Sequence, residues 1–311
     1  MMTGGVGLWW LLLCAVALTN LGLWGWLLRQ AWRAPATLAP GQRSWRTLQL
    51  VLSLGYVAGC AYRSFVPVFD VPRQTLVDAW WSSALVGRSV ATLAELCFAT
   101  QWMLVMRHLA AWPHLPQSPA QSPAQVSPQS LPPQLLPPQS LPPLARALAV
   151  VASRAMLPLT VVAEVCSWYA VLSTSNLGHV LEESIWAFNA ACVSLAAATV
   201  WWRTPGRPAW VAAVAAAASL YAAYLAGVDV PMYWSRWLAT EAAGHGYLDL
   251  AQGLIDAGMR RVVSHRWEDW RSEVVWMTLY FSVGVWFSLW LVRLPLTVPS
   301  WPPARPAAAR A

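Results

Sequence analysis

The sequence predicts an all-helical, polytopic membrane protein, and three observations lead to that prediction. Of the 311 residues, 58% are hydrophobic and only 11% are charged, whereas soluble proteins are roughly 45–50% apolar and about 25% charged. Several apolar runs reach the roughly 20 residues that a helix needs to cross a bilayer. The basic residues concentrate in alternate loops between these runs, which indicates one fixed orientation in the membrane.

We expect a single domain, residues 1–311, with seven transmembrane helices. They cover residues 7–28, 47–69, 77–106, 144–172, 177–202, 208–228 and 273–293. Each run is long enough to cross a hydrocarbon core of about 30 Å at a rise of about 1.5 Å per residue. The first run lacks the positively charged start of a cleaved signal peptide, so we expect it to remain as a helix.

Arginine supplies all of the positive charge, because the chain contains no lysine. Eleven arginines lie on one side of the membrane, while the short segments of the other side hold only Arg73 and, at a helix end, Arg63. Because positive residues concentrate in cytoplasmic loops, the N-terminus is expected outside and the C-terminus in the cytoplasm. The setting is a cell membrane, most simply a bacterial inner membrane. No basic patch with interleaved aromatic residues indicates a nucleic-acid partner, and the oligomeric state is left open.

Two segments between the spans have distinct compositions. Residues 113–143 contain eleven prolines in 31 residues and are expected to form a disordered cytoplasmic linker rich in Pro, Gln and Ser. Residues 229–272 form an outer loop with two expected helices, 231–243 and 247–270. The second has apolar residues at spacings of three and four, which predicts an amphipathic helix lying on the membrane or over a pocket.

Charged residues inside the third and fourth spans predict ion pairs. The third span carries Arg88 and Glu95, and the fourth carries Arg154 and Glu164. Counted from the outer ends, Arg88 lies at a depth similar to that of Glu164, and Glu95 at a depth similar to that of Arg154. We therefore expect the pairs Arg88–Glu164 and Glu95–Arg154 as structural counter-ions. The alternative is that one of the glutamates is a proton carrier or a catalytic acid.

Two segments near the outer side share the pattern His-x-x-acid-acid. They are "HVLEE", with His179, Glu182 and Glu183, and "HRWED", with His265, Glu268 and Asp269. Residues three and four apart share a helix face, so each segment can direct an imidazole and carboxylates to one point, as helical metal sites do. A shared metal site would use His179, Glu183, His265 and Glu268 to bind iron, manganese or zinc. The plainer interpretation is that both segments are polar helix ends, where acidic residues favour the helix N-terminus.

Asp229 follows the sixth span in the tripeptide Asp-Val-Pro, a pattern that also occurs at Asp70–Pro72. An aspartate before a proline is typical of a helix start, with the aspartate as N-cap and the proline in the first turn. We therefore interpret both as helix caps without a chemical role.

The most specific function that these residues favour is a membrane-embedded enzyme acting on a lipid-like substrate in an outward-facing polar pocket. Its acid–base or metal-binding residues would be those of the two His-x-x-acid-acid segments. Arg63 and Arg88 would orient an anionic head group. Two alternatives remain: a transporter or proton-coupled carrier that uses the intramembrane Glu and Arg residues, and a non-catalytic membrane scaffold.

Several membrane-protein and enzyme classes are excluded. A retinal protein needs a Schiff-base lysine, and the chain has none. The pair Glu182–Glu183 is not the EExxxR motif of intramembrane glutamic proteases, because Ala187 stands where that motif has arginine. No phosphate-binding glycine loop, GxSxG elbow or HExxH zinc motif is present. No motif in the sequence identifies a family.

Overall fold

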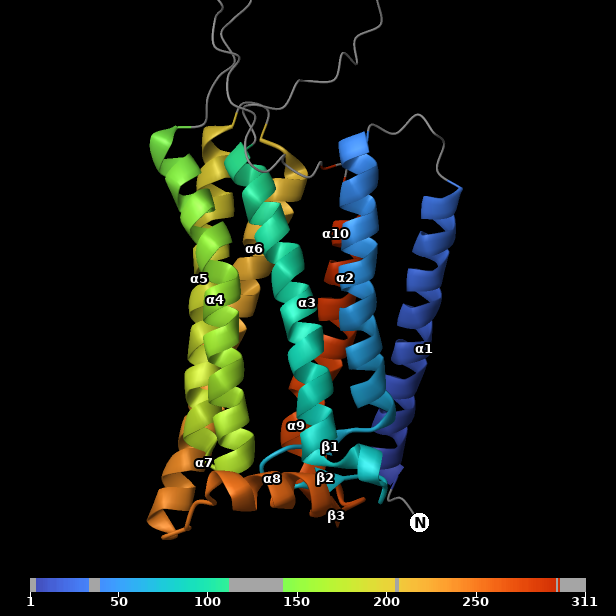
Figure 1. The fold of residues 1–311 in the computed structure, drawn as a ribbon, viewed down its shortest axis with the longest axis vertical. Helices are drawn as coiled ribbons and strands as arrows, with labels where there is room; N and C mark the ends of the chain where they lie inside the picture. The colour runs from blue at the N-terminus through green and yellow to red at the C-terminus, as the bar shows by residue number, and fades with distance from the viewer. Residues whose placement is uncertain (1–3, 34–39, 112–141, 205–206, 295, 297–311) are drawn as a thin grey trace, which may run out of the picture.

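The computed structural model describes residues 4–33, 40–111, 142–204, 207–294 and 296, and these residues form a helical bundle with a small sheet at one end (Figure 1). The helices are α1 Gly4–Trp32, α2 Pro40–Phe65, α3 Ala84–Ala111, α4 Pro143–Ser173, α5 Asn176–Arg203, α6 Ala209–Tyr224, α7 Val230–Ala242, α8 Leu250–Met259, α9 Trp267–Leu279 and α10 Val285–Arg293. Most of the linker expected at 113–143 lies outside the described residues.

Six helical stretches of the described chain are long and apolar enough to cross a membrane. They are α1, α3, α4, α5, the continuous stretch Ala209–Ala242 and the continuous stretch Trp267–Arg293. The chain is therefore an integral, multi-pass membrane protein with an all-helical body. The helix α2, which contains most of the expected span 47–69, runs beside these stretches (Figure 1) but is more polar and is not among the six.

Polar and small side chains hold α2 against its neighbours. Gln101 of α3 donates to the Gln49 side chain over 2.8 Å and accepts from Ser288 of α10 over 2.6 Å. Gly55 and Gly59 lie one turn apart on α2 where an added Cβ would clash with Cys97 and Ala94 of α3. Close approach at small residues and interhelical hydrogen bonds are the usual means of packing helices within a membrane.

The sixth span does not end at Asp229, contrary to the expected helix start there. A π turn, η3 Leu225–Asp229, joins α6 to α7 without a break, and the Val230 amide donates to the Leu225 carbonyl. A proline lacks the amide that an α-helix needs and clashes with the preceding turn. The wider π turn precedes Pro231 and lets the helix continue. Asp229 is consequently inside a helical stretch, has helical backbone angles and caps nothing. Asp70, in the other Asp-Val-Pro tripeptide, is also no helix cap, because turns and a strand follow it.

Two other expected helices are shortened by a small sheet. The strands are β1 Val68–Phe69, β2 Gln74–Thr75 and β3 Val262–Val263, with β2 antiparallel to β1 and parallel to β3. Because β2 and a 3₁₀ turn, Trp80–Ser82, precede it, α3 begins at Ala84 and not at residue 77. Because β3 pairs with β2, the helix expected over 247–270 is divided into α8 and the start of α9.

Arg73 joins three parts of this end of the bundle. It lies next to β2 with a left-handed backbone angle, φ 60°, and its side chain is buried. Its guanidinium donates to the Asp70 carbonyl over 2.6 Å, to the Val171 carbonyl of α4 over 2.7 Å and to the Asp256 carboxylate of α8 over 2.7 Å. This clamp holds α8 across the ends of α3 and α4 (Figure 1).

Replacing Arg73 is expected to release α8. The substitution Arg73→Met leaves two carbonyls and a carboxylate without their donor, so we expect the free energy of opening α8 to fall by about 3 kcal/mol. The measurement is amide hydrogen exchange in α8. The matched control is Arg260→Met, since Arg260 contacts the same Asp256 over 3.7 Å but is 58% exposed. Equal exchange of α8 in the two variants would contradict the clamp.

Candidate functional site

A pocket lined by ionisable side chains lies inside the bundle, near the end that carries the sheet. It has about 960 Å³ of empty space, part of which is open to solvent. Residues from α2, α3, α5, α6, α7 and α9 contribute to its walls. The ionisable residues of its walls, tyrosines and cysteine aside, are Arg63, Asp70, Arg88, Glu95, His179, Glu182, Glu183, Asp229 and Glu273.

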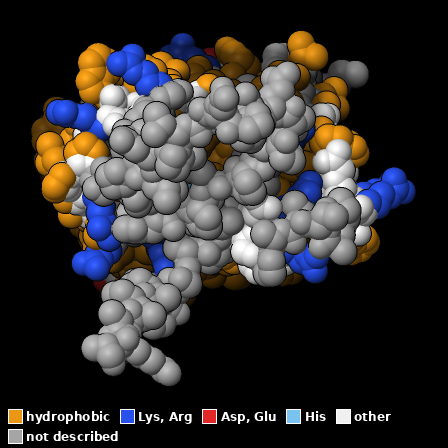
Figure 2. Space-filling model, turned by 90° about the horizontal axis from the view of Figure 1, so that it is seen from above, with side chains coloured by type: hydrophobic (Ala, Val, Ile, Leu, Met, Phe, Trp, Pro, Cys, Tyr) orange, Lys and Arg blue, Asp and Glu red, His pale blue; other side chains and the backbone are white. Residues whose placement is uncertain are grey.

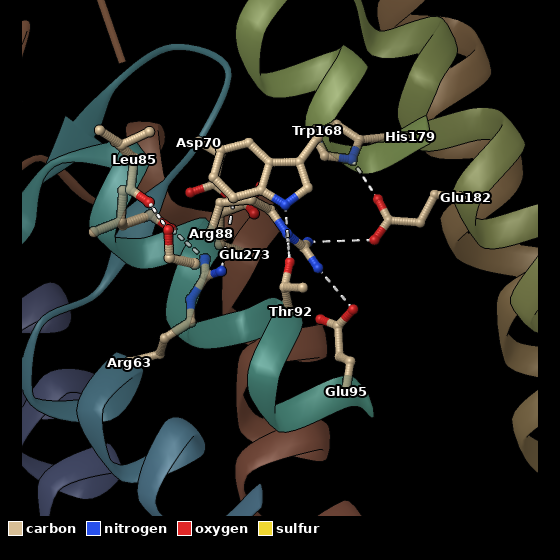
Figure 3. Close-up of polar contacts among 12 residues, drawn as sticks. Arg63, Asp70, Leu85, Arg88, Thr92, Glu95, Trp168, His179, Glu182 and Glu273 are labelled. Atoms are coloured by element: carbon tan, nitrogen blue, oxygen red, sulfur yellow. Dashed lines mark hydrogen bonds and ion pairs between the residues drawn. The ribbon is translucent and has the colours of Figure 1, made fainter. Parts of the chain in front are cut away.

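Arg88 stands at the centre of the charged groups (Figure 3). Its Nη2 lies 2.7 Å from Glu95 Oε2 and 2.8 Å from Glu164 Oε2, and its Nη1 lies 3.3 Å from Glu182 Oε1. Thr92, one turn further along α3, donates to the same Glu164 oxygen over 2.5 Å. One buried guanidinium therefore connects carboxylates from α3, α4 and α5.

Of the two expected ion pairs, the structure contains the one between Arg88 and Glu164. Glu95 does not pair with Arg154; it shares Arg88 with Glu164. Arg154 is exposed on α4. The reason is helical geometry, because Arg154 and Glu164 are ten residues apart and point about 80° away from each other.

The first His-x-x-acid-acid segment belongs to the pocket. His179 Nδ1 lies 2.8 Å from Glu182 Oε2, and the imidazole packs against the Tyr233 ring at 4.8 Å between centroids. Glu182 is thus shared between His179 and Arg88 (Figure 3). Glu183 also lines the pocket, and its buried Oε2 has no hydrogen-bond partner among the described residues.

The second segment lies away from the pocket. His265 Nε2 is 3.0 Å from the Leu76 carbonyl, beside the sheet. Asp269 accepts from the Ser264 hydroxyl, and the Glu268 side chain is 64% exposed. The four residues of the expected metal site are not brought together, and no group of three or more His, Cys, Asp or Glu residues in the described chain is placed to hold a metal ion. The physical reason is the extended segment at β3, which fixes His265 to the sheet.

Both arginines expected to bind an anionic head group are occupied by the protein itself. Arg63 donates to the Val68 carbonyl over 2.8 Å and lies 3.5 Å from the Asp70 carboxylate. Arg88 is surrounded by three glutamates. In the structure, Arg63 and Arg88 therefore orient carboxylates of the pocket itself.

Sequence reasoning missed Glu273 and misread Asp229. Glu273 is fully buried and accepts from Arg236 over 2.9 Å and from the Trp276 indole over 2.6 Å. A lone acid at the start of an apolar run was the available signal. Asp229 is 3% exposed and its Oδ1 has no partner among the described residues. Asp229 was interpreted as a helix cap because an aspartate two residues before a proline is typical of a helix start.

Carboxyl groups outnumber guanidinium groups in the pocket. Among the described residues, six carboxyl groups and two guanidinium groups line it; Glu164, bound to Arg88, and Arg236, bound to Glu273, add one of each. An uncompensated buried charge is costly. The pocket therefore favours protons or a positively charged ligand over an anion.

An apolar crevice adjoins the pocket and extends away from the sheet. It has about 300 Å³ of empty space, part of which is open to its surroundings, and shares Phe98, Trp186 and Tyr221 with the pocket. Its other walls include Trp102 of α3 and Val193 of α5, both further along their helices from the charged groups. The charged pocket and the apolar crevice thus meet at these three shared residues.

Comparison with known proteins finds no matching family model, no similar curated protein and no similar solved structure.

Removing the central cation is expected to destabilise the bundle. In Arg88→Met, three carboxylates, two of them buried, lose their common partner, which typically costs about 3–5 kcal/mol. The measurement is the yield and thermal midpoint of detergent-purified protein. Adding Glu95→Gln and Glu164→Gln is expected to restore part of the loss, because fewer charges are then left unpaired.

The matched control for Arg88 is Arg154→Met, since Arg154 is exposed on α4 and such a change usually stays within about 0.5 kcal/mol. A loss of stability in Arg154→Met as large as in Arg88→Met would contradict the assignment of Arg88 as the central cation.

Proposed function

We propose that the chain spans the membrane seven times, with its N-terminus outside and its C-terminus in the cytoplasm. The seventh span is α2, supported by its place between α1 and α3 and by the Gln49–Gln101 hydrogen bond inside the bundle. The orientation is supported by arginines around the rim of the end opposite the sheet (Figure 2), including Arg29, Arg203 and Arg293 in the last turns of their helices. Such residues favour the cytoplasmic side.

The outer loop then lies at the outer surface of the membrane. Helix α8 buries Gly253 and Ala257 against the bundle, and it exposes large apolar side chains on its other face. They are Leu250, Leu254, Ile255 and Met259. An exposed apolar helix face suits the interface between lipid and water.

The proposed function is that of a membrane-embedded enzyme acting on an amphipathic, lipid-like molecule. The observation that carries this proposal is the junction of the charged pocket with the apolar crevice at Phe98, Trp186 and Tyr221. A polar group placed among charged side chains and a hydrocarbon chain placed among apolar ones would each find a matching environment. The crevice extends toward the middle of the bundle, as a lipid tail extends from its head group.

His179 is the proposed general acid–base group. Its Nδ1 is bound to Glu182, which fixes the orientation of the ring and leaves Nε2 for the substrate. This arrangement, with a carboxylate orienting an imidazole, is a common way of preparing histidine for proton transfer. Arg88 in turn positions Glu182.

We expect His179→Asn to slow conversion of a lipid about a hundredfold or more, which is the range of acid–base catalysis by one side chain. The protein is reconstituted in nanodiscs with a total lipid extract of the expressing cells, and mass spectrometry follows which species is consumed and which appears. The matched control is His245→Asn, because His245 is exposed in the outer loop. A folded protein that converts no species would overturn the enzyme; uptake of a species into vesicles without conversion would then favour the carrier.

Cysteine labelling tests the proposed orientation. In a cysteine-free background, a membrane-impermeant maleimide applied to intact cells is expected to label Ala251→Cys on α8. The same reagent is expected to label Ala147→Cys, at the end of α4 that lies away from α8, only after the cells are permeabilised. Both positions are exposed, and the reverse pattern of labelling would contradict an outward N-terminus.

A further inference from the structure

We infer that the polar end of the pocket takes a protonated primary amine, held by Asp229 and Glu183, so that the ligand is an amphipathic amine. This inference rests on the proposed function and adds the chemical class of the head group. It comes from the unpartnered atoms of the pocket, from its balance of charge and from the stripe of side chains along α5.

The unpartnered atoms of the pocket are mainly acceptors. Among the described pocket residues, three carboxylate oxygens are buried without a hydrogen-bond partner, against one donor nitrogen. They are Asp70 Oδ1, Glu183 Oε2 and Asp229 Oδ1, and the donor is Arg63 Nε. Asp229 is the most deeply buried of the three carboxylates, with 3% exposure. A buried acceptor without a partner is costly, and a ligand that brings N–H donors would satisfy it.

The arginines near the pocket form their ion pairs with carboxylates other than Asp229 and Glu183. Arg63 is bound to Asp70, Arg88 to three glutamates and Arg236 to Glu273. In the described chain no arginine lies within ion-pair distance of Asp229 or Glu183. These two carboxyl groups line the same pocket. A cation between them would balance both.

The unpartnered acceptors need N–H donors, and this need favours a primary amine over cations that carry no N–H group. A primary ammonium has three N–H donors, whereas a quaternary ammonium has none, although both carry the same charge. Aromatic rings would also favour a cation, but two rings of this pocket, those of Trp276 and Tyr233, already face cations of the protein. Arg63 lies 5.7 Å from the Trp276 ring centroid, and Arg236 lies 5.2 Å from that of Tyr233.

The face of α5 leads from the acceptors into the crevice. Glu183 and Trp186 both line the pocket, and Trp186, Ala190 and Val193 all line the crevice. Spacings of three and four place these residues in one stripe along the helix. An amine at Glu183 would therefore direct its hydrocarbon chain past Trp186 and along the apolar wall.

The experiment compares four amphiphiles with the same eight-carbon chain: octylamine, octyltrimethylammonium, octanoate and octanol. Binding to the full-length protein in zwitterionic nanodiscs is measured by calorimetry, with empty nanodiscs as the partition baseline. We expect octylamine to bind most tightly. In Asp229→Asn and Glu183→Gln, its affinity is expected to fall by about tenfold to a hundredfold, as loss of a charge-assisted hydrogen bond would cause.

Asp78→Asn is the matched control for Asp229→Asn, because Asp78 is 73% exposed and forms a surface ion pair with Arg261. It should leave octylamine binding within about twofold of the unmodified protein. Thermal midpoints verify that each variant is folded. The comparison among the four ligands uses the unmodified protein and so does not depend on any variant.

Each other outcome overturns a defined part of the argument. Equal binding of octylamine and octyltrimethylammonium would overturn the N–H requirement, and tighter binding of octanoate would overturn the amine. Octanol or octanoate binding as well as octylamine would leave the amphipathic site of the proposed function in place while refuting the amine. If none of the four bound, the amphipathic site itself would be wrong.

Discussion

A guanidinium group inside a membrane-spanning bundle is stable only when acceptors surround it, and Arg88 meets this requirement with carboxylates from three helices. Glu95 comes from α3, Glu164 from α4 and Glu182 from α5. Neighbouring positions on a helix point about 100° apart, so a shift of one residue in any of these helices would remove a carboxylate from the cluster. The requirement to neutralise Arg88 thus fixes how α3, α4 and α5 face one another. It also fixes which residues of α5 line the pocket.

The pocket differs from a purely structural ion-pair network in two ways. A network that only holds helices together would be expected to satisfy its buried polar atoms, whereas acceptors on Glu183 and Asp229 have no partner in the described chain. It would also not need to adjoin an apolar crevice that shares Phe98, Trp186 and Tyr221 with it. Unsatisfied acceptors beside an apolar crevice are the features on which the proposed site for an amphipathic ligand rests. They support the proposed ligand site over a non-catalytic scaffold.

The end of the bundle near the pocket is closed by segments far apart in the sequence. Strand β2, before α3, pairs with β3, which lies nearly 190 residues later. Arg73 connects this sheet to α4 and α8 through three hydrogen bonds. The closure places α8 across the bundle end and keeps His265 at the sheet, away from His179. The same contacts therefore position α8 and separate the two segments that resemble each other in sequence.

Local and compositional features of the sequence were enough for the helical class, the membrane setting and the first, fourth and fifth expected helices, which become α1, α4 and α5, because hydrophobic length is a property of a continuous segment. They were also enough to place Arg88 opposite Glu164, since depth along antiparallel helices depends only on residue count. Sequence reasoning failed where rotation or distant pairing mattered. The partner of Glu95 depended on which way Arg154 points, and the fate of His265 depended on a strand paired with residues 74–75.

Asp229 and Glu273 show most clearly the difference between what local sequence indicates and what helix packing decides. In the sequence, Asp229 has the spacing of a helix cap and Glu273 is a single acid at the start of an apolar run. Asp229 becomes a pocket residue because the π turn continues the helix through it, and Glu273 because this face of α9 packs into the bundle. Segment length, hydropathy and helical spacing can be read from one stretch of chain. The convergence of Arg88, Asp229, Glu183 and Glu273 on one cavity is a property of packed helices, which no single stretch contains.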